Sequence, residues 1–139
     1  MIRVAMPCPN DLITHWGEIE PFVSAAVDES NGELTVESIK AKVESGEIAI
    51  ATVFSDETLV AAISFDIIEF DSGMRVINIQ CAGGTMMDKW FEQVEAIANN
   101  LAKSHNCTKI YIIGRKGWAR QMKGLGYEPI HTVIAKEVR

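Results

Sequence analysis

Apolar side chains in the N-terminal third of the chain recur every three or four residues, which is the spacing of one buried helix face. This spacing predicts two helices, over residues 10–27 and 35–45, after a short strand at Ile2–Met6. The apolar positions that define the two helices are Leu12, Trp16, Ile19, Val23, Val36, Ile39 and Val43.

The expected ends of these helices carry residues with known terminal preferences. Asn10 and Thr35 are suitable N-caps, because a short polar side chain accepts a hydrogen bond from an amide of the first turn. Pro21 is expected to break or kink the first helix, since it has no amide hydrogen. Gly46 is expected to end the second helix in the left-handed conformation.

The middle of the chain changes to the alternating, β-branched pattern of strands. Three strands are expected, at Ile48–Phe54, Leu59–Phe70 and Met74–Cys81. Turns rich in Asp, Ser and Gly separate them, at residues 55–57 and 71–73. Because such short connections join antiparallel neighbours, the three strands are expected to form a meander.

Helical spacing returns after these strands. Thr85 opens a long predicted helix, and Thr85 with Asp88 has the form of a capping box. A strand at Thr108–Ile113, a short helix at Gly117–Leu125 and a final strand at Ile130–Val138 complete the pattern. The expected fold is α+β, with a mixed central sheet in the order β-α-α-β-β-β-α-β-α-β. The apolar face of the long helix holds Trp90, Phe91, Val94, Ile97, Ala98 and Leu101.

The composition fits one globular domain over residues 1–139, with 47% hydrophobic and 23% charged residues. No membrane is expected as a partner, because no apolar run approaches the roughly 20 residues of a membrane span. No nucleic acid is expected either, because the net charge is −6. Residues 1–73 carry 3 basic and 14 acidic side chains, whereas residues 74–139 carry 10 basic and 5 acidic ones. The basic half suits an anionic cofactor and the acidic half a cationic substrate; ordinary solvated surface is the alternative.

The cysteines and histidines are too scattered to form a site in the sequence. Cys8, Cys81 and Cys107 lack the paired spacing of zinc or redox motifs, and His15 and His105 have no evident partner, so no metal is predicted. A sparse, odd set of thiols suits a reducing compartment, and a cytoplasmic location is expected.

A strand-to-helix junction is the main candidate for a ligand site. Two glycines allow a ligand to approach the main chain closely, and the first amides of a helix have no intrahelical partners. Together with the helix dipole they suit a diphosphate, although a plain turn would show the same pattern. The residues of this candidate cofactor site are Gln80, Cys81, Ala82, Gly83, Gly84 and Thr85.

Four side chains in the C-terminal part are further candidates. Arg115 and Lys116 follow a predicted strand, and the carboxyl end of a strand is a common place for ligand contacts. They suit cofactor phosphates, unless they are surface charges. Tyr127 and His131 are secondary candidates for proton transfer, because a phenol donates a proton and a histidine titrates near neutral pH. Core packing of Tyr127 and simple exposure of His131 are the competing interpretations.

The order of elements resembles the acyl-CoA N-acyltransferase (GNAT) fold over nearly the whole chain. Gln80–Thr85 is similar to the pyrophosphate loop of that family, Gln/Arg-x-x-Gly-x-Gly/Ala, and Gly126-Tyr127 matches its glycine–aromatic step after the last helix. Within the family, Gly114–Trp118 running on to Tyr127 resembles short phage-encoded GNAT-like proteins. The resemblance implies acetyl-CoA as cofactor, bound by Gln80–Thr85 with Arg115 and Lys116.

The resemblance also implies a reaction. In the family an amine attacks the thioester carbonyl directly, and a tyrosine often protonates the departing thiolate. The corresponding position in this sequence is Met122, and the family's frequent asparagine corresponds to Arg115, so neither role is transferred.

Two functional hypotheses follow. The first is an acetyl-CoA-dependent N-acetyltransferase acting on a small or peptide amine. The second is a catalytically inactive GNAT-fold phage accessory or virion protein, found in the host cytoplasm or the virion. The partners are then acyl-CoA and an amine for the first, and virion proteins for the second. Pairing of two chains along the exposed edge at Ile130–Val138 is open in both.

Overall fold

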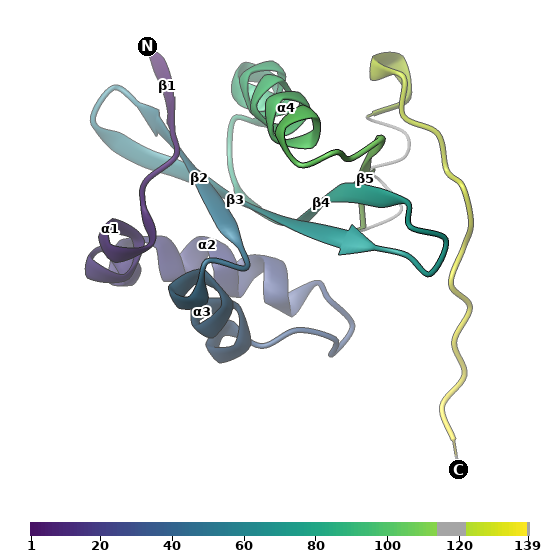
Figure 1. Ribbon diagram of the computed structural model, residues 1–139. Coiled ribbons are helices and arrows are strands. Elements are labelled where there is room, and N and C mark those ends of the chain that lie inside the picture. The colour runs from purple at the N-terminus through teal and green to yellow at the C-terminus, as the bar shows by residue number, and fades with distance from the viewer. Residues whose placement is uncertain (114–121, 139) are drawn as a thin grey trace.

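A computed structural model describes residues 1–113 and 122–138 of the protein. Its centre is a five-stranded sheet in the order β1-β2-β3-β4-β5 (Figure 1). The first four strands pair antiparallel, whereas β5 runs parallel to β4. The expected mixed sheet with its antiparallel meander is thus confirmed. The strands are β1 (Ile2–Ala5), β2 (Ala49–Ser55), β3 (Thr58–Glu69), β4 (Arg75–Gly84) and β5 (Lys109–Ile112).

Helices cover both faces of the sheet (Figure 1). Side chains alternate between the two faces along a strand, so each face of β3 builds a separate core. Ala61, Ile63 and Phe65 belong to the core under α4, whereas Ala62 belongs to the core under α1–α3. The helices are α1 (Pro9–Thr14), α2 (Trp16–Asp28) and α3 (Val36–Ser45) on one face and α4 (Met87–Ser104) on the other.

The predicted ends of α3 are both confirmed. The Thr35 side chain accepts a hydrogen bond of 3.1 Å from the amide of Ser38, which satisfies one amide of the first turn. Gly46 follows the helix with φ of 83°, the left-handed conformation that glycine adopts without a steric penalty.

The predicted start and break of the first helical region were wrong in detail. Cys8, not Asn10, is the N-cap, because Pro9 occupies the first helical position, where its missing amide hydrogen is not needed. The helices separate at His15, whereas Pro21 lies inside α2. The carbonyl that Pro21 leaves unpaired belongs to Gly17, in the first turn of α2, where the backbone can adjust to the proline ring.

The C-terminal prediction was also wrong in part. A helix was predicted over Gly117–Leu125. Its first part, up to position 121, lies outside the described residues, and its last part, Lys123–Leu125, forms a short 3-10 helix. No strand forms over Ile130–Val138: this segment runs free of the sheet in Figure 1, with Val133 and Ile134 exposed by 82% and 92%. A β-branched sequence predicts strand character, but a strand also needs a neighbouring edge, and none of the described strands lies alongside this segment.

Candidate functional site

Strand β4 is longer than its neighbour β5, and this difference leaves an open backbone edge. The last pair of residues between the two strands is Ile79 and Ile112. Beyond it β4 continues through Gly84, still paired with β3 on its other side. Among the described residues no strand covers the outer edge of Gln80–Gly84. This edge holds most of the predicted cofactor segment.

A β-bulge marks the point where the edge opens. Ile63 pairs with Ala82 and Phe65 with Ile79, so β4 has one more residue than β3 between the two pairs. The extra residue falls at Gln80–Cys81. Bulges increase local twist and occur often beside functional sites, where they redirect a strand.

The two glycines of β4 are explained by packing inside the protein. A Cβ atom on Gly83 would lie 2.9 Å from the carbonyl carbon of Phe22, in the backbone of α2. Gly84 has φ of 131°, and a Cβ there would lie 2.5 Å from the Cα of Ala61. Both glycines therefore allow close approach of protein backbone. The interpretation of Gly83 and Gly84 as a turn after the strand was wrong, because both are strand residues.

The predicted capping box at Thr85 was wrong too. Helix α4 begins at Met87, its N-cap is Met86 in the left-handed conformation, and no side chain caps it. The backbone of Thr85 is held by other partners: its amide donates to the carbonyl of Val60 at 3.0 Å, and its carbonyl accepts from the indole of Trp90 at 2.7 Å. The bond to Val60 continues the hydrogen bonding between β3 and β4 one residue beyond the end of β4, and the helix begins two residues later.

The described residues fit the arm of acetyl-CoA better than its diphosphate. The open edge at Gln80–Gly84 offers main-chain groups to the amides of an extended ligand. At the start of α4, the amides of Met87 and Asp88 have no intrahelical acceptor, whereas the amide of Lys89 already donates to Met86 at 2.8 Å. The carboxylate of Asp88 is exposed in the same turn and opposes an anion.

The remaining predicted site residues are not brought together with this edge by any described contact. Arg115 and Lys116 lie outside the described residues. The ring of Tyr127 packs edge-on against Phe91 of α4, with centroids 6.4 Å apart. Its hydroxyl is buried without a hydrogen bond to a described residue. Burial, with a contribution from the nearby Glu95 carboxylate, raises the pKa of Tyr127 to about 12. His131 is exposed in the free C-terminal segment.

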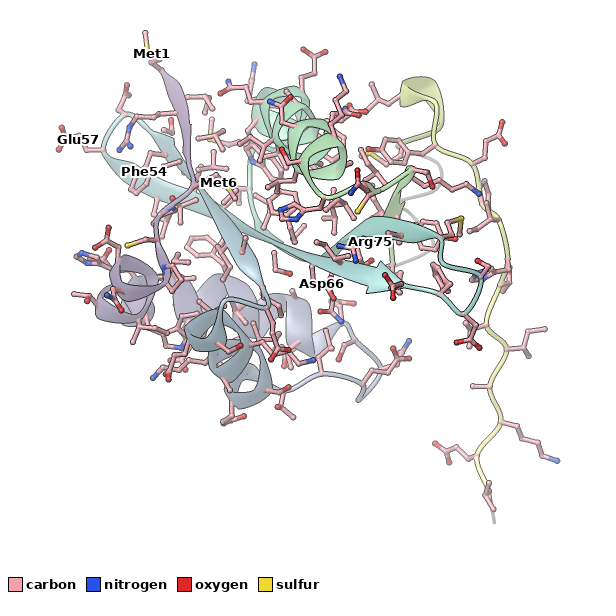
Figure 2. All side chains as sticks on the ribbon, in the orientation of Figure 1. Met1, Met6, Phe54, Glu57, Asp66 and Arg75 are labelled. Atoms are coloured by element: carbon pink, nitrogen blue, oxygen red, sulfur yellow. The ribbon has the colours of Figure 1, made fainter. Side chains whose placement is uncertain are left out.

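Sequence reasoning missed a polar pair on the sheet face under α2 and α3. Asp66 of β3 and Asn78 of β4 are direct cross-strand partners, and Asn78 Nδ2 donates to Asp66 Oδ1 at 3.0 Å. Figure 2 shows Asp66 on the side of the sheet that carries these helices. A signal was present, since each residue stands between two large apolar residues of its strand, but 12 positions separate them in sequence.

This pair is not fully satisfied within the protein. Asn78 is only 1% exposed, and its Oδ1 has no hydrogen-bond partner among the described residues; an unmet buried acceptor costs about 1–3 kcal/mol. Burial raises the pKa of Asp66, while the bond from Asn78 and the charge of Lys42 partly offset that effect. The pair therefore combines a half-buried carboxylate with a buried free carbonyl.

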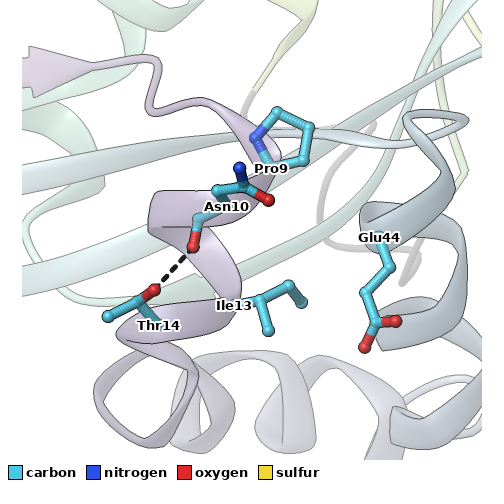
Figure 3. Close-up of a pocket in the computed structure, with 5 residues that line it drawn as sticks. All are labelled: Pro9, Asn10, Ile13, Thr14 and Glu44. Carbon is cyan, nitrogen blue, oxygen red and sulfur yellow. Dashed lines mark hydrogen bonds between the residues drawn. The ribbon is translucent and has the colours of Figure 1, made fainter.

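A separate hollow of about 370 Å³ lies between α1 and α3 (Figure 3). Its lining contains a single charged group and no residue of β4 or α4, so it is distinct from the open edge. The lining residues are Pro9, Asn10, Ile13, Thr14 and Glu44.

Among the described residues, no group of three or more His, Cys, Asp or Glu side chains is suited to a metal ion. No described helix is long and apolar enough to cross a membrane.

Comparison with known proteins supports the architecture. No protein-family model matches the sequence, and no curated protein matches it either. Solved structures do match. A ribosomal-protein-alanine N-acetyltransferase from Brucella melitensis biovar Abortus superposes with a TM-score of 0.66 and 10% identity, covering 100% of this chain and 99% of the other. A predicted acetyltransferase with acetyl-CoA from Clostridium acetobutylicum gives 0.69 and 13%, covering 99% and 96%.

A third structure extends the range of similar enzymes. Glucosamine-6-phosphate N-acetyltransferase from Arabidopsis thaliana gives a TM-score of 0.64 at 12% identity, covering 100% and 99% of the two chains. At sequence identities this low, the structural similarity shows the fold alone. The similarity covers nearly the whole of each chain. The chain therefore has the α+β fold of the GNAT acetyltransferases.

Proposed function

We propose that this protein is an acyl-CoA-dependent N-acyltransferase that transfers an acetyl group to a small or peptide amine. The observation that carries the proposal is the open backbone edge at Gln80–Gly84, placed directly before α4 within a GNAT fold. An extended ligand with amide groups binds such an edge as an added strand. We assign the phosphates of the same ligand to the start of α4, three residues further along, where two amides are free although the Asp88 carboxylate opposes an anion.

Each proposed role belongs to a specific part of the chain. When bound, acetyl-CoA supplies a thioester whose carbonyl carbon is open to attack by an amine. The main chain of Gln80–Gly84 orients the arm of the cofactor, and the free amides of Met87 and Asp88 face its phosphates. Arg115 and Lys116 are proposed to neutralise the phosphate charge.

The candidate residues for proton transfer are Tyr127 and His131, and their roles are proposed from the chemistry of their side chains. Tyr127 Oη, with a pKa of about 12, keeps its proton at neutral pH. It therefore does not suit the role of base, and the same shift makes it a weaker donor to a departing thiolate than an ordinary phenol. His131, which is exposed in the C-terminal segment, is proposed as the base because a neutral imidazole nitrogen accepts a proton.

A catalytically inactive GNAT-fold phage protein, acting as an accessory or virion component, is the second candidate. The side chain at the family's usual tyrosine position is Met122, which is 3% exposed and packed in the core under α4. Gly83 and Gly84 are also occupied by contacts to α2 and β3. Both observations favour a retained fold with reduced cofactor chemistry.

Transfer of the acetyl group separates the two candidates. The purified protein is incubated with acetyl-CoA and a panel of primary amines, and free CoA thiol is measured with a thiol reagent. Amine-dependent release of thiol supports the enzyme. Acetyl-CoA binding without any transfer, or no binding at all, supports the inactive protein.

The position of the phosphates is tested by a charge at the start of α4. Asp88→Asn removes a negative charge from the first turn and should tighten acetyl-CoA binding by about 2–5-fold at low salt. The matched control is Glu92→Gln, an exposed carboxylate in the next turn, which should change the affinity less. Equal effects of the two variants would place the phosphates elsewhere.

A further inference from the structure

Exposed apolar side chains are concentrated in the C-terminal segment of residues 130–138. Apart from Met1, the most exposed large hydrophobic side chains of the described residues are Val133, Ile134 and Val138, at 82%, 92% and 99%. The segment runs extended and free of the sheet (Figure 1). Side chains of this β-branched kind suit a strand, and concentrations of exposed apolar side chains mark interaction sites. The segment therefore has the chemistry of a strand but pairs with none of the described strands.

The outer edge of β5 is incomplete in a matching way, because no described strand pairs with it. On one face of β5, Ile110 and Ile112 are only partly buried at the margin of the core under α4. On the other face, Tyr111 is partly exposed, with its ring 5.9 Å from that of Phe70. Ile113, directly after the strand, is 55% exposed. Apolar side chains on both faces are thus incompletely covered, as expected of a strand that lacks a neighbour.

A short hinge joins the free segment to the body of the protein. The ring of Tyr127 packs against Phe91, and its amide donates to the carbonyl of Met122 at 3.4 Å, so the chain is anchored at this point. Only Glu128 and Pro129 lie between the anchor and the free segment. Proline fixes its own φ and restricts the residue before it to extended conformations. The hinge therefore favours a straight exit and disfavours a reversal onto the chain's own sheet.

We propose that residues 130–138 pair as a strand with the outer edge of β5 in a second copy of this chain, which donates its own segment in return. Reciprocal exchange of an identical element is a common route to dimers. The main chain of the receiving edge supplies hydrogen bonds, and alternate side chains of the added strand cover the two faces of β5.

A second copy fits better than an unrelated partner, because the free strand and the incomplete edge belong to the same chain. Each copy then completes both incomplete parts of the other. A hinge of two residues keeps both hinges close to the twofold axis, so the receiving edge lies on the side of the sheet from which the segment departs. Figure 1 shows the segment on the side away from β1, the other edge strand of the sheet. The receiving edge is therefore β5.

The first test is the mass of the full chain by sedimentation equilibrium from about 1 to 100 μM, where a dimer is expected. Ile134→Glu adds a charge to a side chain that is 92% exposed in the single chain. The variant should therefore fold, but its dimer dissociation constant should rise at least about tenfold. Met6→Glu, which places the same charge on an exposed side chain directly after β1, is the matched control and should leave the dimer unchanged.

A longer hinge separates exchange from simple association. Inserting about four glycine and serine residues after Pro129 allows the segment to return to its own β5. The dimer should then become a monomer with an unchanged far-ultraviolet circular dichroism spectrum. In the unmodified protein, 13C-labelled and unlabelled chains are unfolded and refolded together. Isotope-filtered NOEs should then connect residues 130–138 of one copy with residues 109–113 of the other.

Four results would overturn the exchange: a monomer at all concentrations, a dimer unaffected by Ile134→Glu, a dimer that persists with the longer hinge, or intermolecular NOEs from the segment to β1 or to the same segment of the other copy. The outcome is independent of the proposed function, because the receiving edge faces away from β4 and leaves the open edge after Ile79 uncovered. An exchanged dimer that ignores acetyl-CoA keeps the interface and removes the transferase. A monomer that transfers acetyl groups does the reverse.

Discussion

Glycine 83 gives the sharpest test of how β4 is held against the helices. A Cβ atom at this position would lie 2.9 Å from the carbonyl carbon and 3.2 Å from the Cα of Phe22. The obstructing atoms are helix backbone, so no side chain can rotate to make room. Gly83→Ala therefore has to push α2 away from β4 or distort the strand.

The expected cost follows from overpacking of a well-packed interface, which typically destabilises a protein by about 1–3 kcal/mol. For a chain of 139 residues, that loss lowers the melting temperature by roughly 3–10 °C. The matched control is Gly17→Ala in α2, where nothing lies within 4 Å of the added atom. Alanine at this position in the first turn of α2 should not destabilise the protein, and its gain should stay below the roughly 0.5–1 kcal/mol expected in the middle of a helix.

Urea denaturation followed by far-ultraviolet circular dichroism measures both effects as changes in the free energy of unfolding. A Gly83→Ala protein as stable as the unmodified chain would refute the close packing of α2 on β4. It would instead support the hypothesis from the sequence that Gly83 lets a ligand approach the main chain. Destabilisation by both variants would instead indicate that α2 tolerates no change at all.

Two further predictions concern the same stability measurement. Thr35→Ala should lower the free energy of unfolding by about 1 kcal/mol, because the Ser38 amide loses its cap, while Thr35→Ser should retain most of it; equal loss in both would reject the cap. Burial raises the pKa of Asp66 above its usual value of 3.8, so the folded chain binds this proton more tightly than the unfolded chain. The resulting stabilisation is present below the unfolded pKa and is lost as pH rises through the folded one. Asp66→Asn should therefore gain stability relative to the unmodified protein between acid and neutral pH, and a constant difference across that range would contradict the burial.

The sequence predicted best those features that depend on local chemistry. The ends of α3 were predicted correctly, because Thr35 and Gly46 act through their own backbone conformation and first-turn hydrogen bonds. The hairpins of the sheet followed from short polar turns between β-branched runs. These signals need no knowledge of distant parts of the chain.

The junction between β4 and α4 was predicted less well for a physical reason. Glycine occurs both where the backbone needs unusual dihedral angles and where another backbone segment packs closely against it. The sequence alone does not show which of these two reasons applies at a given glycine. Gly83 faces Phe22, which is 61 positions away along the chain, so only the fold reveals its role. Thr85 was assigned to the helix cap because its bond to Val60, an extension of the β3–β4 pairing, is not visible in sequence.

The candidate site shows the same division. The segment Gln80–Thr85 was singled out in the sequence, and the open edge of β4 lies within it. The pair of Asp66 and Asn78 was not, because sheet register alone brings the two side chains together. A polar residue inside an apolar strand is a usable signal, and two such residues on neighbouring strands are a stronger one.

The central claim is that the open edge of β4 and the start of α4 bind acyl-CoA. The most direct measurement is a titration of the 15N-labelled protein with acetyl-CoA, followed through backbone amide signals and a parallel thermal melt. The account predicts shifts concentrated at Gln80–Gly84 and Met87, and a stabilisation of about 2.7 kcal/mol at a ligand concentration of one hundred times the dissociation constant. No change at millimolar acetyl-CoA, or shifts confined to the hollow between α1 and α3, would contradict it.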